Sequence, residues 1–497
     1  MNSRLRYTPW LFALLVTFFG CQPNTEKQLP STSSHSADRP NVILIVVDDQ
    51  RWDEFGAMGH PFLKTPNIDR LAQEGALFTN AYQVVPLCSP NRASILTGQY
   101  PSRHGIIDNV ARDRASHRLD LFAPWLQQAG YTTAHIGKWH MGNDPTPRPG
   151  YDFWSCLPGQ GRTIDPILFE NGHLDTITGY VTDILTDKMV EFIRTHQDHP
   201  FFAYLGHKAI HPDVKQLNSG AVDLASGHRF IPAPRHAGTY RNSHFNRRPN
   251  ALSSYTQIDS SSVTGKALIA KNSLEMQKEF GDGFLDHFTS EETIRDRSEM
   301  LLAVDESLGR ILTTLEELSM LDKTCLIFTS DNGYFYGEHG LSLERRLPYE
   351  ESVRTPLLIR YPPLIPKAYR EEHFTLSIDY APTILDLAGV PIPPTMQGHS
   401  LVPLFQGPVK QWRQSFLMEY YSYENPMPWL IDTDYKAFRK GKYKYIRWYK
   451  YLDRDELYDL EADPYELHNL VHETGMQSVV KEMKQELAEA AARAMGL

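Results

Sequence analysis

The stretch from Cys88 to Gln99 places a sulfur nucleophile, a proline and an arginine just ahead of a helix-forming run, and it reads Cys-Ser-Pro-Asn-Arg-Ala-Ser-Ile-Leu-Thr-Gly-Gln. Pro90 suits the first turn of a helix, because its missing N–H would have no partner there. A helix N-terminus attracts anions, and Arg92 can point back at the same place. The stretch therefore predicts Cys88 at a helix N-terminus that faces an anion. A buried structural cysteine is the commoner role, and the rest of the chain decides between the two interpretations.

Two pairs of metal-type side chains follow two predicted strands. Continuous apolar runs occur at Asn41–Val47, which is rich in β-branched residues, and at Thr324–Thr329. Runs of this kind are typical of strands that are buried on both faces of a parallel sheet. The first run ends in Asp48-Asp49 and the second in Ser330-Asp331-Asn332-Gly333. Open α/β sheets bind ligands beyond the carboxyl ends of their strands, and oxygen ligands there suit a hard divalent cation. Asp and Asn also cap strand ends, but two pairs at equivalent places favour a metal.

Cationic and imidazole side chains follow two further predicted strands. Thr132–Ile136 leads into Gly137-Lys138-Trp139-His140, and Phe201–Leu205 leads into His207-Lys208-Ala209-Ile210-His211-Pro212. A lone histidine after a strand is usually a polar loop residue. Here each group follows its own strand, so we expect both at the sheet edge that carries the carboxylates.

These motifs, in this order, resemble those of the type I sulfatases. The resemblance covers Cys-x-Pro-x-Arg, Asp-Asp, Gly-Lys-Trp-His, His-Pro and Asp-Asn-Gly, and it runs from about Arg39 to Leu470. In that family the cysteine is converted by a maturation enzyme to formylglycine (3-oxoalanine), whose hydrated aldehyde is the nucleophile. A geminal diol can shed sulfate by carbonyl formation, which Ser or Cys could not do. The likeness is closest to N-acetylglucosamine-6-sulfatases and other bacterial carbohydrate sulfatases.

The resemblance implies a role for each motif residue. Arg92 would stabilise the hydrated formylglycine, and His140 would act on its second hydroxyl to help expel sulfate. Lys138 and His211 would bind the sulfate oxygens, with His211 placed to protonate the leaving alcohol, an effect worth roughly two to four orders of magnitude in rate. A single Ca²⁺ would lower the cost of bringing a nucleophile to an anion. Its implied ligands are Asp48, Asp49, Cys88, Asp331 and Asn332.

Two positions depart from the usual family pattern. Arg345 stands where a lysine usually precedes the pair that here is Tyr349-Glu350. Arginine can bridge two sulfate oxygens but lacks the compact charge of lysine, and we assign Arg345 to sulfate binding. Asn91 stands where Ser, Ala or Thr is commoner. Because the cysteine, proline and arginine of the motif are intact, we expect maturation to proceed.

Length and composition agree with a large enzyme. The chain has 497 residues, of which 41% are hydrophobic and 11% aromatic, ample for a large core. The net charge of −10 argues against nucleic-acid binding by the protein as a whole. A positive site for an anionic substrate must therefore be local. Four cysteines are too few for a disulfide scaffold. Cys156 and Cys325 are either free thiols or a single bridge.

The N-terminus is predicted to be a targeting segment. Arg4 and Arg6 precede an apolar stretch, Trp10–Phe19, that is too short to span a bilayer. Residues 1–21 resemble a bacterial lipoprotein signal in which Cys21 becomes the lipidated first residue. The alternative is cleavage to a soluble periplasmic protein. Residues 22–38 are predicted to be a flexible tether, and both alternatives place the protein in the periplasm or cell envelope.

Strands and helices alternate along most of the chain. Helices are predicted at Asn67–Glu74, ended by Gly75 as a C-cap, and on the apolar faces spanning Val181–Ile193 and Leu301–Leu315. The resemblance implies an α/β fold, an alkaline phosphatase-like doubly wound sheet over residues 39–399. Residues 400–497 would form a smaller α+β subdomain, with strands at Ser415–Tyr421 and Lys442–Tyr451 and a helix at Gln477–Met495. We find no internal repeat.

The substrate is less well defined by the sequence. A polar insertion lies between Pro212 and Arg297, and its segment His228–Arg248 carries no acidic residue but several arginines, namely Arg229, Arg235, Arg241, Arg247 and Arg248. Such a loop suits a polyanionic chain or is simply solvated. Lys442–Tyr451 could grip a sugar or be a strand with one wet face. By proximity to the nucleophile, three residues could line a sugar subsite: Arg103, His104 and Asn109.

Three functions fit these features. The favoured one is a calcium-dependent, exo-acting sulfatase acting on glycosaminoglycan or algal polysaccharide fragments. The second is a phosphate or phosphonate monoester hydrolase of the same superfamily, and the pairing of Cys-x-Pro-x-Arg with Gly-Lys-Trp-His argues for sulfate instead. The third is a silent glycan-binding lipoprotein, which the competent residue types at every catalytic position disfavour.

Overall fold

The computed structural model describes residues 39–497 apart from 222, 224–228, 252–289, 342–344, 408, 410, 423–429, 431 and 452. The predicted signal and tether, residues 1–38, and part of the polar insertion lie outside the described residues. Within the described residues, no helix combines the length and the apolar character that crossing a membrane requires.

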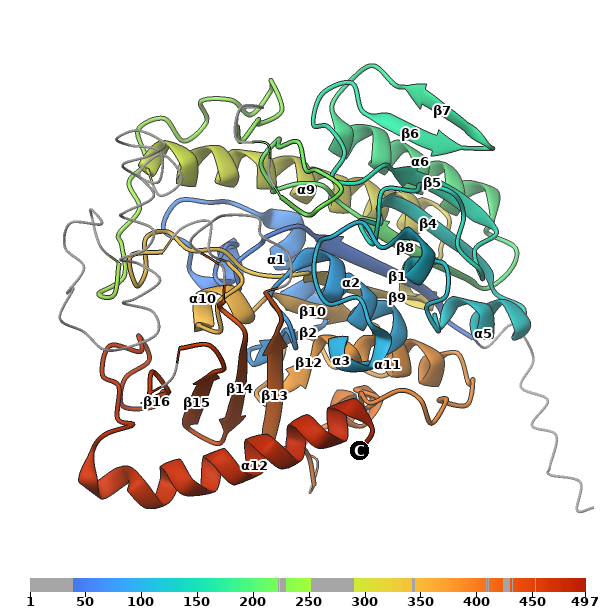
Figure 1. Ribbon diagram of the computed structural model, residues 1–497. Helices are drawn as coiled ribbons and strands as arrows, with labels where there is room; N and C mark the ends of the chain where they lie inside the picture. The colour runs from blue at the N-terminus through green and yellow to red at the C-terminus, as the bar shows by residue number, and fades with distance from the viewer. Residues whose placement is uncertain are drawn as a thin grey trace, which may run out of the picture. The chain divides into compact units, whose positions relative to one another are not determined.

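A ten-stranded mixed sheet forms the centre, in the order β11-β2-β10-β9-β1-β8-β4-β5-β6-β7 (Figure 1). The inner strands β9, β1, β8, β4 and β5 are all parallel to one another, as in an open α/β sheet. The strands are β1 (Asn41–Val47), β2 (Ala76–Phe78), β4 (Thr132–Lys138), β5 (Phe153–Leu157), β6 (Ile167–Glu170), β7 (His173–Thr176), β8 (Phe201–Gly206), β9 (Thr324–Ser330), β10 (Leu357–Arg360) and β11 (Tyr369–Glu371). Two short strands, β3 (Ala81–Tyr82) and β12 (Thr375–Leu376), pair separately.

Both faces of this sheet are covered by helices (Figure 1). In β1 the alternate residues Ile43, Ile45 and Val47 belong to one buried cluster, and Val42, Leu44 and Val46 to another. The first cluster includes residues of α1 (Pro66–Glu74), α6 (Val181–Thr195) and α9 (Glu291–Glu317). The second includes residues of α2 (Cys88–Thr97), α5 (Ala123–Gln128) and α11 (Tyr380–Leu387). Burial on both faces explains why the strands lack polar alternation.

The predicted site strands and helices are present. The site strands shift by at most two residues at their ends, whereas α9 begins ten residues before the predicted Leu301. The strand before Asp48 has the predicted bounds, and β4, β8 and β9 each run one or two residues further. Gly75 follows α1 as its C-cap, with φ −141° and ψ −144°. A Cβ there would lie 2.3 Å from the Ile359 carbonyl oxygen. Gly75 is thus the C-cap that we expected, and the close approach of β10 explains why glycine is required there.

A four-stranded antiparallel sheet, β13-β14-β15-β16, follows the main sheet in the chain. Its strands are β13 (Ser415–Tyr420), β14 (Tyr435–Lys440), β15 (Tyr443–Trp448) and β16 (Glu456–Asp459). The helix α12 (Gln477–Met495) packs on one face, where Phe438 and Tyr445 meet Met483 (Figure 1). Residues of the other face, such as Tyr435 and Ile446, belong to the large cluster of the main sheet. The expectation of one wet face on the segment from Lys442 is therefore wrong, because this sheet is covered on both sides.

Cys156 and Cys325 are free, buried thiols. Cys156 lies in β5 and Cys325 in β9, and three strands of the main sheet separate them. The bridge that the sequence left open is not formed.

Candidate active site

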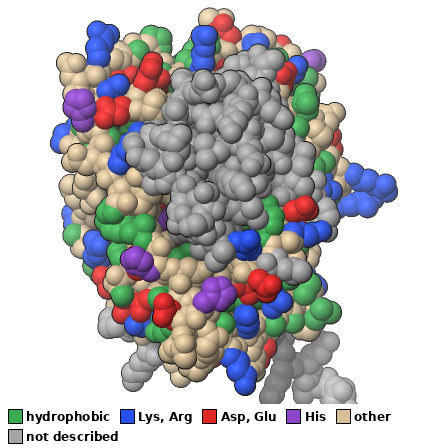
Figure 2. Space-filling view, turned by 60° about the vertical axis from the view of Figure 1, so that its left-hand side comes forward, with side chains coloured by type: hydrophobic (Ala, Val, Ile, Leu, Met, Phe, Trp, Pro, Cys, Tyr) green, Lys and Arg blue, Asp and Glu red, His purple; other side chains and the backbone are tan. Residues whose placement is uncertain are grey.

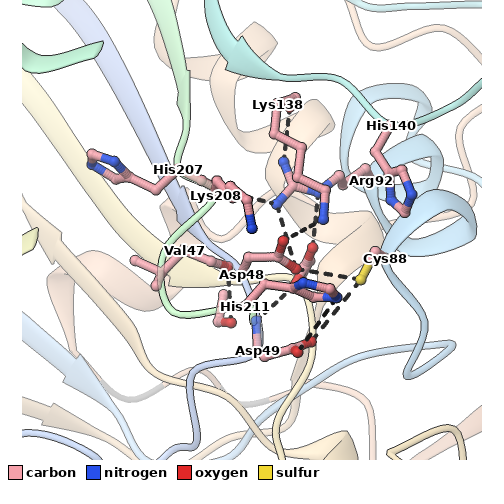
Figure 3. A network of polar contacts seen from close by, with 12 residues as sticks. Val47, Asp48, Asp49, Cys88, Arg92, Lys138, His140, His207, Lys208 and His211 are labelled. Carbon is pink, nitrogen blue, oxygen red and sulfur yellow. Dashed lines mark hydrogen bonds and ion pairs between the residues drawn. The ribbon is translucent and has the colours of Figure 1, made fainter. Parts of the chain in front are cut away.

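Four neighbouring strands deliver the predicted motif residues to one place. In the order β9-β1-β8-β4, each strand ends in a polar segment. The segment after β1 is tied to the one after β8, because the Asp48 amide donates to the Ala209 carbonyl and the Ile210 amide donates to the Asp48 carbonyl, at 2.8 and 2.9 Å. Asp48 and Asp49 after β1 thereby lie beside His211 after β8 (Figure 3).

Cys88 is the first residue of α2, and its side chain points at these strand ends (Figure 3). Its Sγ lies 3.3 Å from Asp48 Oδ1, 3.5 Å from Asn332 Oδ1 and 4.0 Å from Asp49 Oδ1. Burial, together with the nearby carboxylates, raises the pKa of the Cys88 thiol well above its usual value. A thiolate is therefore disfavoured at residue 88.

The carboxylates form a bonded cluster with Asn332. The Asp49 amide donates to Asp331 Oδ1 at 3.2 Å, and Asn332 Nδ2 donates to Asp49 Oδ1 at 2.6 Å. Asp49 has a left-handed backbone, with φ 67°, which turns its side chain into the cluster. Gly333, the next residue after Asn332, lies against α10 (Glu350–Val353), and a Cβ there would be 2.0 Å from the Glu351 carbonyl oxygen. Only glycine permits this approach.

The donor set of this cluster fits a hard divalent cation. Asp48, Asp49, Cys88 and Asp331 each offer an atom, and these atoms lie within 4.8 Å of one another. Asp49 Oδ2 is buried and has no hydrogen-bond partner in the described part of the chain. Burial and the neighbouring Asp48 raise the pKa of Asp331 to about 7, and burial raises the pKa of Asp49 as well. Crowded buried carboxylates of this kind are stabilised by a cation bound to their oxygens.

Three cationic side chains meet the three carboxylates. Arg92 donates through Nε to Asp331 Oδ2 at 2.8 Å, and Lys138 Nζ contacts Asp48 Oδ2. Arg345 pairs through Nε with Asp49 Oδ1 at 3.0 Å. Burial alone would raise the pKa of Asp48, but the charges of Lys138, His211 and Arg92 outweigh it and hold that pKa well below its usual value. The three positive charges of the cluster are thus balanced by three carboxylates. On the face that Figure 2 shows, basic and acidic side chains intermingle.

Two histidines complete the cluster with defined ring orientations. His211 Nδ1 donates to the Pro212 carbonyl at 2.8 Å, so its Nε2 faces inward and accepts from Arg345 Nη2 at 2.8 Å. His140 Nε2 donates to Gln216 Oε1 at 2.7 Å, and its Nδ1 lies 3.5 Å from Ser89 Oγ. Burial lowers the pKa of both imidazoles well below the usual value. In this arrangement both rings are neutral.

Several residues of the site carry no sequence motif. Gln160 accepts from Lys138 Nζ at 2.5 Å and donates to Gln216 at 3.1 Å. These two glutamines line a cavity of about 420 Å³, and they connect it to Lys138 and His140 through their hydrogen bonds. Arg297, inside the apolar face of α9, donates to the Asp49 carbonyl at 2.7 Å. A charged residue among apolar helix positions was the one signal that could have identified Arg297, whereas no pattern marks the glutamines.

The secondary substrate-binding expectations have mixed outcomes. Arg235 is paired with Asp183 and Glu306, and Arg248 with Asp53 and Glu351. These two arginines of the basic segment are therefore already neutralised. Arg229 and Arg241 are exposed, and residue 228 lies outside the described residues.

Of the three residues expected near the nucleophile, His104 bonds the main chain of Pro90 in the first turn of α2, and Asn109 bonds the residue that follows Cys88. The Asn109 side chain accepts from the Ser89 amide at 3.1 Å. Arg103 lies against Gly496 at the end of α12. His104 is buried against Ser94 of α2.

Comparison with known proteins agrees with this geometry. The sulfatase family model matches residues 40–390, and the C-terminal model of N-sulphoglucosamine sulphohydrolase matches residues 337–493. The chain belongs to the sulfatase family. This sulfatase is accordingly a hydrolase of sulfuric esters with the α/β fold and smaller antiparallel subdomain of its relatives.

Two curated relatives and one solved structure illustrate the similarity. The sulfatase is 32% identical to an N-acetylglucosamine-6-O-sulfatase of Bacteroides thetaiotaomicron, over 91% of this chain and 86% of that protein. It is 30% identical to a choline-sulfatase of Rhizobium meliloti, over 87% and 82% of the two chains. A solved structure in complex with its substrate D-glucosamine-2-N,6-O-disulfate is 31% identical, with a TM-score of 0.76 and coverage of 92% and 98%.

Proposed function

We propose that this sulfatase removes sulfate from a sulfated carbohydrate, with residue 88 in the formylglycine form and one Ca²⁺ held by Asp48, Asp49, Asp331, Asn332 and residue 88. The observation that carries the proposal is the position of Cys88. Its Sγ stands 3.3 Å from Asp48 and 3.5 Å from Asn332 at the start of a buried helix. Its raised pKa makes an unmodified thiol a poor nucleophile there.

Formylglycine would supply a hydrated aldehyde as nucleophile, and Ca²⁺ would lower the cost of bringing it to an anion. Lys138 and Arg345 now contact Asp48 and Asp49. A cation bound by these carboxylates would leave both side chains to hold sulfate oxygens, while Arg92 stays on Asp331 and stabilises residue 88. The cluster would then present its positive charge to the sulfate ester.

The histidines would move the protons. His211 donates its Nδ1 proton to the Pro212 carbonyl and accepts from Arg345 at its inward-facing Nε2. Once Arg345 turns to the sulfate, Nε2 would be free to take up a second proton as the anionic ester binds. In that imidazolium form, His211 would give the Nε2 proton to the leaving alcohol. His140 is held by Gln216 with its Nδ1 toward the start of α2. From there it would accept a proton from the second hydroxyl of residue 88. Overall, water and a sulfate ester give an alcohol and hydrogen sulfate.

We infer a glucosamine 6-O-sulfate unit as the preferred substrate. The 32% identical relative is named for that specificity, and the 31% identical structure holds a 6-O-sulfated glucosamine. The cavity that Gln160 and Gln216 line contains apolar side chains, such as Ile167 and Val214, and also amide and charged groups, among them Gln160, Arg162 and Asp213. Such groups match the hydroxyls and the amino substituent of a sugar.

We also propose that the chain is exported as a lipoprotein through Cys21, that a formylglycine-generating enzyme matures it, and that residues 39–399 and 400–497 are its catalytic domain and C-terminal subdomain. The name of a 30% identical relative from Drosophila melanogaster, an extracellular sulfatase homologue, supports export. Incorporation of labelled palmitate, lost on Cys21→Ser, would test the anchor.

The function is tested by sulfate release from a panel of esters, with formylglycine at residue 88 verified by mass. The panel holds glucosamine 6-sulfate, uronate 2-sulfate, ulvan and carrageenan fragments, choline sulfate, and one aryl alcohol as both sulfate and phosphate. Release from glucosamine 6-sulfate that is lost in Cys88→Ala and kept in Cys156→Ala, a buried cysteine of β5, supports the proposal. Release only from choline sulfate or from the aryl phosphate contradicts it.

A further inference from the structure

A second cavity, of about 320 Å³, lies apart from the reacting groups. Its lining includes Trp52 and Arg248, Glu350 and Arg354 at the two ends of α10, and Arg439 of β14. Between Glu350 and Arg354, the main chain of Glu351 and Ser352 bonds to Gly333 and Tyr334, next to Asn332. The short helix α10 thus separates this cavity from the catalytic cluster.

The charges around this cavity are not balanced. Arg248 pairs with Asp53 and with Glu351, and Glu350 pairs with Lys444 at 3.1 Å while accepting from the Tyr82 hydroxyl. Arg354 donates only to the Thr79 carbonyl, and Arg439 only to the Gly441 carbonyl. Among the described residues, neither of these two guanidinium groups has a carboxylate within ion-pair distance. Their charges nevertheless help to lower the pKa of Glu350. The lining therefore sets three arginines against this one carboxylate.

Arg439 is unpaired where its cross-strand neighbour is paired. It lies directly opposite Lys444 on β15, and like charges opposed in this way repel. Lys444 is bound by Glu350 and by Glu466, the latter at 2.6 Å. Arg439 is nine-tenths buried without such a partner. An anion beside Arg439 would relieve this repulsion.

Two buried donors of the lining also find no acceptor among the residues that the structure describes. They are Nη1 of Arg439 and the indole Nε1 of Trp52. The Trp52 ring carries Arg354 at 4.1 Å and Arg248 at 5.0 Å from its centroid, which holds both guanidinium groups in place. Buried polar groups are rarely left without a hydrogen-bond partner. Two such donors in the lining of one cavity point to a ligand that is rich in hydrogen-bond acceptors.

We propose that this cavity is a second anion site, which binds a sulfate group between Arg354, Arg439 and Trp52. Arginine pairs bidentately with tetrahedral oxyanions, and a sulfate supplies acceptors for both unsatisfied donors. The group is either free sulfate or a second sulfate of a multiply sulfated saccharide. The site itself rests on the lining of the cavity, and only the saccharide source rests on the proposed function.

The site is tested by counting bound sulfate. Equilibrium dialysis with radiolabelled inorganic sulfate is run on the full-length Cys88→Ala protein, which cannot turn over. We expect Arg439→Gln to lose one bound sulfate per chain relative to its parent. Arg447→Gln, an exposed arginine on β15, should lose none. An unchanged number and affinity in Arg439→Gln would overturn the proposal.

A second variant covers the case in which Arg439→Gln fails to fold. Trp52→Phe keeps an aromatic ring for Arg354 and removes only the unsatisfied N–H, so sulfate affinity should fall several-fold. Affinity equal to that of the parent would count against the site. Thermal unfolding without sulfate verifies that each variant is folded.

Kinetics of the matured enzyme separate the two sources of the sulfate. If the group belongs to the saccharide, Arg439→Gln raises KM about tenfold for a disulfated substrate and leaves a monosulfated one within twofold. If it is free sulfate, KM is unchanged for both while the dialysis loss persists. Failure of the proposed function would appear as no turnover of either substrate, with the sulfate count unaffected.

Discussion

Asn91 Nδ2 donates to the main-chain oxygen of Asp331 over 2.6 Å. This bond ties the helix that begins at Cys88 to the end of the strand that delivers Asp331. The same amide also donates to Gln83 Oε1, and Gln83 in turn donates to the Ser330 carbonyl at 3.1 Å. Asn91 therefore has a structural reason to stand where the family commonly has a smaller side chain, because its length spans from α2 to β9.

Replacing Asn91 should destabilise the protein more than an ordinary surface change does. In Asn91→Ala the Asp331 carbonyl and Gln83 Oε1 would lose a buried donor, which costs about 1–3 kcal/mol for each unsatisfied group. Urea denaturation measures the loss in the free energy of unfolding. Asn242→Ala, at an exposed turn position, should change it by less than about 0.5 kcal/mol. Equal stability of the two variants would rule out the bridging role.

Calcium should raise the thermal stability of the chelator-treated protein. Ligand that binds only the folded state stabilises it by about 2.7 kcal/mol at one hundred times Kd. Asp331 offers one of the clustered carboxylates. The variant Asp331→Asn should therefore bind calcium at least tenfold more weakly and be stabilised less by it. Differential scanning calorimetry with Ca²⁺ and with Mg²⁺ measures the response and identifies the preferred ion.

An exposed aspartate supplies the control for calcium binding. Asp198→Asn, on an exposed segment, should respond to calcium as the parent does. A calcium response that survives intact in Asp331→Asn would place the ion elsewhere in the protein.

Much of the fold could be predicted because the hydrophobic pattern of each strand already indicates how deeply that strand must be buried. The unbroken apolar run Asn41–Val47 could be stable only between two layers, and β1 is buried on both faces. Parallel strands end at a common edge, so the polar pairs after β1 and β9 had to meet there. The order of residues along these strands was enough to predict most of the cluster.

The remaining site residues depend on contacts between segments far apart in the chain. Gln160 and Gln216 belong to two loops after different strands, and only their meeting at 3.1 Å creates a bridge between Lys138 and His140. No spacing rule links them. Lys444 likewise reads as a wet-face residue in its strand, yet Glu350 and Glu466 bury it. Tertiary packing decides such positions.

Acid should destabilise this protein partly through His135. Its ring is stacked between Trp154 and Tyr204, with centroids 4.3 and 5.3 Å away, and burial lowers its pKa to about 3. The unfolded chain therefore takes up a proton near pH 6.5 that the folded chain takes up only near pH 3. Stability is lost as pH falls through this window, by about 2 kcal/mol per such histidine between pH 7.5 and 5.

The variant His135→Phe removes this proton uptake. Tighter packing of a phenyl ring costs the same at every pH, so the difference between pH 7.5 and pH 5 is the informative quantity. By urea denaturation, that difference should be about 2 kcal/mol smaller than in the parent. His173→Phe, at an exposed strand position, should keep the parental difference. A parental difference in His135→Phe would mean that the buried ring is not titrating as described.

Arg345 should be required for turnover through both of its contacts. Its guanidinium spans Asp49 Oδ1 at 3.0 Å and His211 Nε2 at 2.8 Å, and a lysine carries the charge but has no fork to span two partners. We expect Arg345→Gln to lower kcat/KM at least 100-fold, equivalent to about 2.7 kcal/mol of transition-state stabilisation, and Arg345→Lys to lower it about tenfold. Arg370→Gln, exposed on β11, should leave sulfate release unchanged. Equal rates for Arg345→Lys and the parent would show that charge alone suffices, since the fork geometry would then contribute nothing to the transition state.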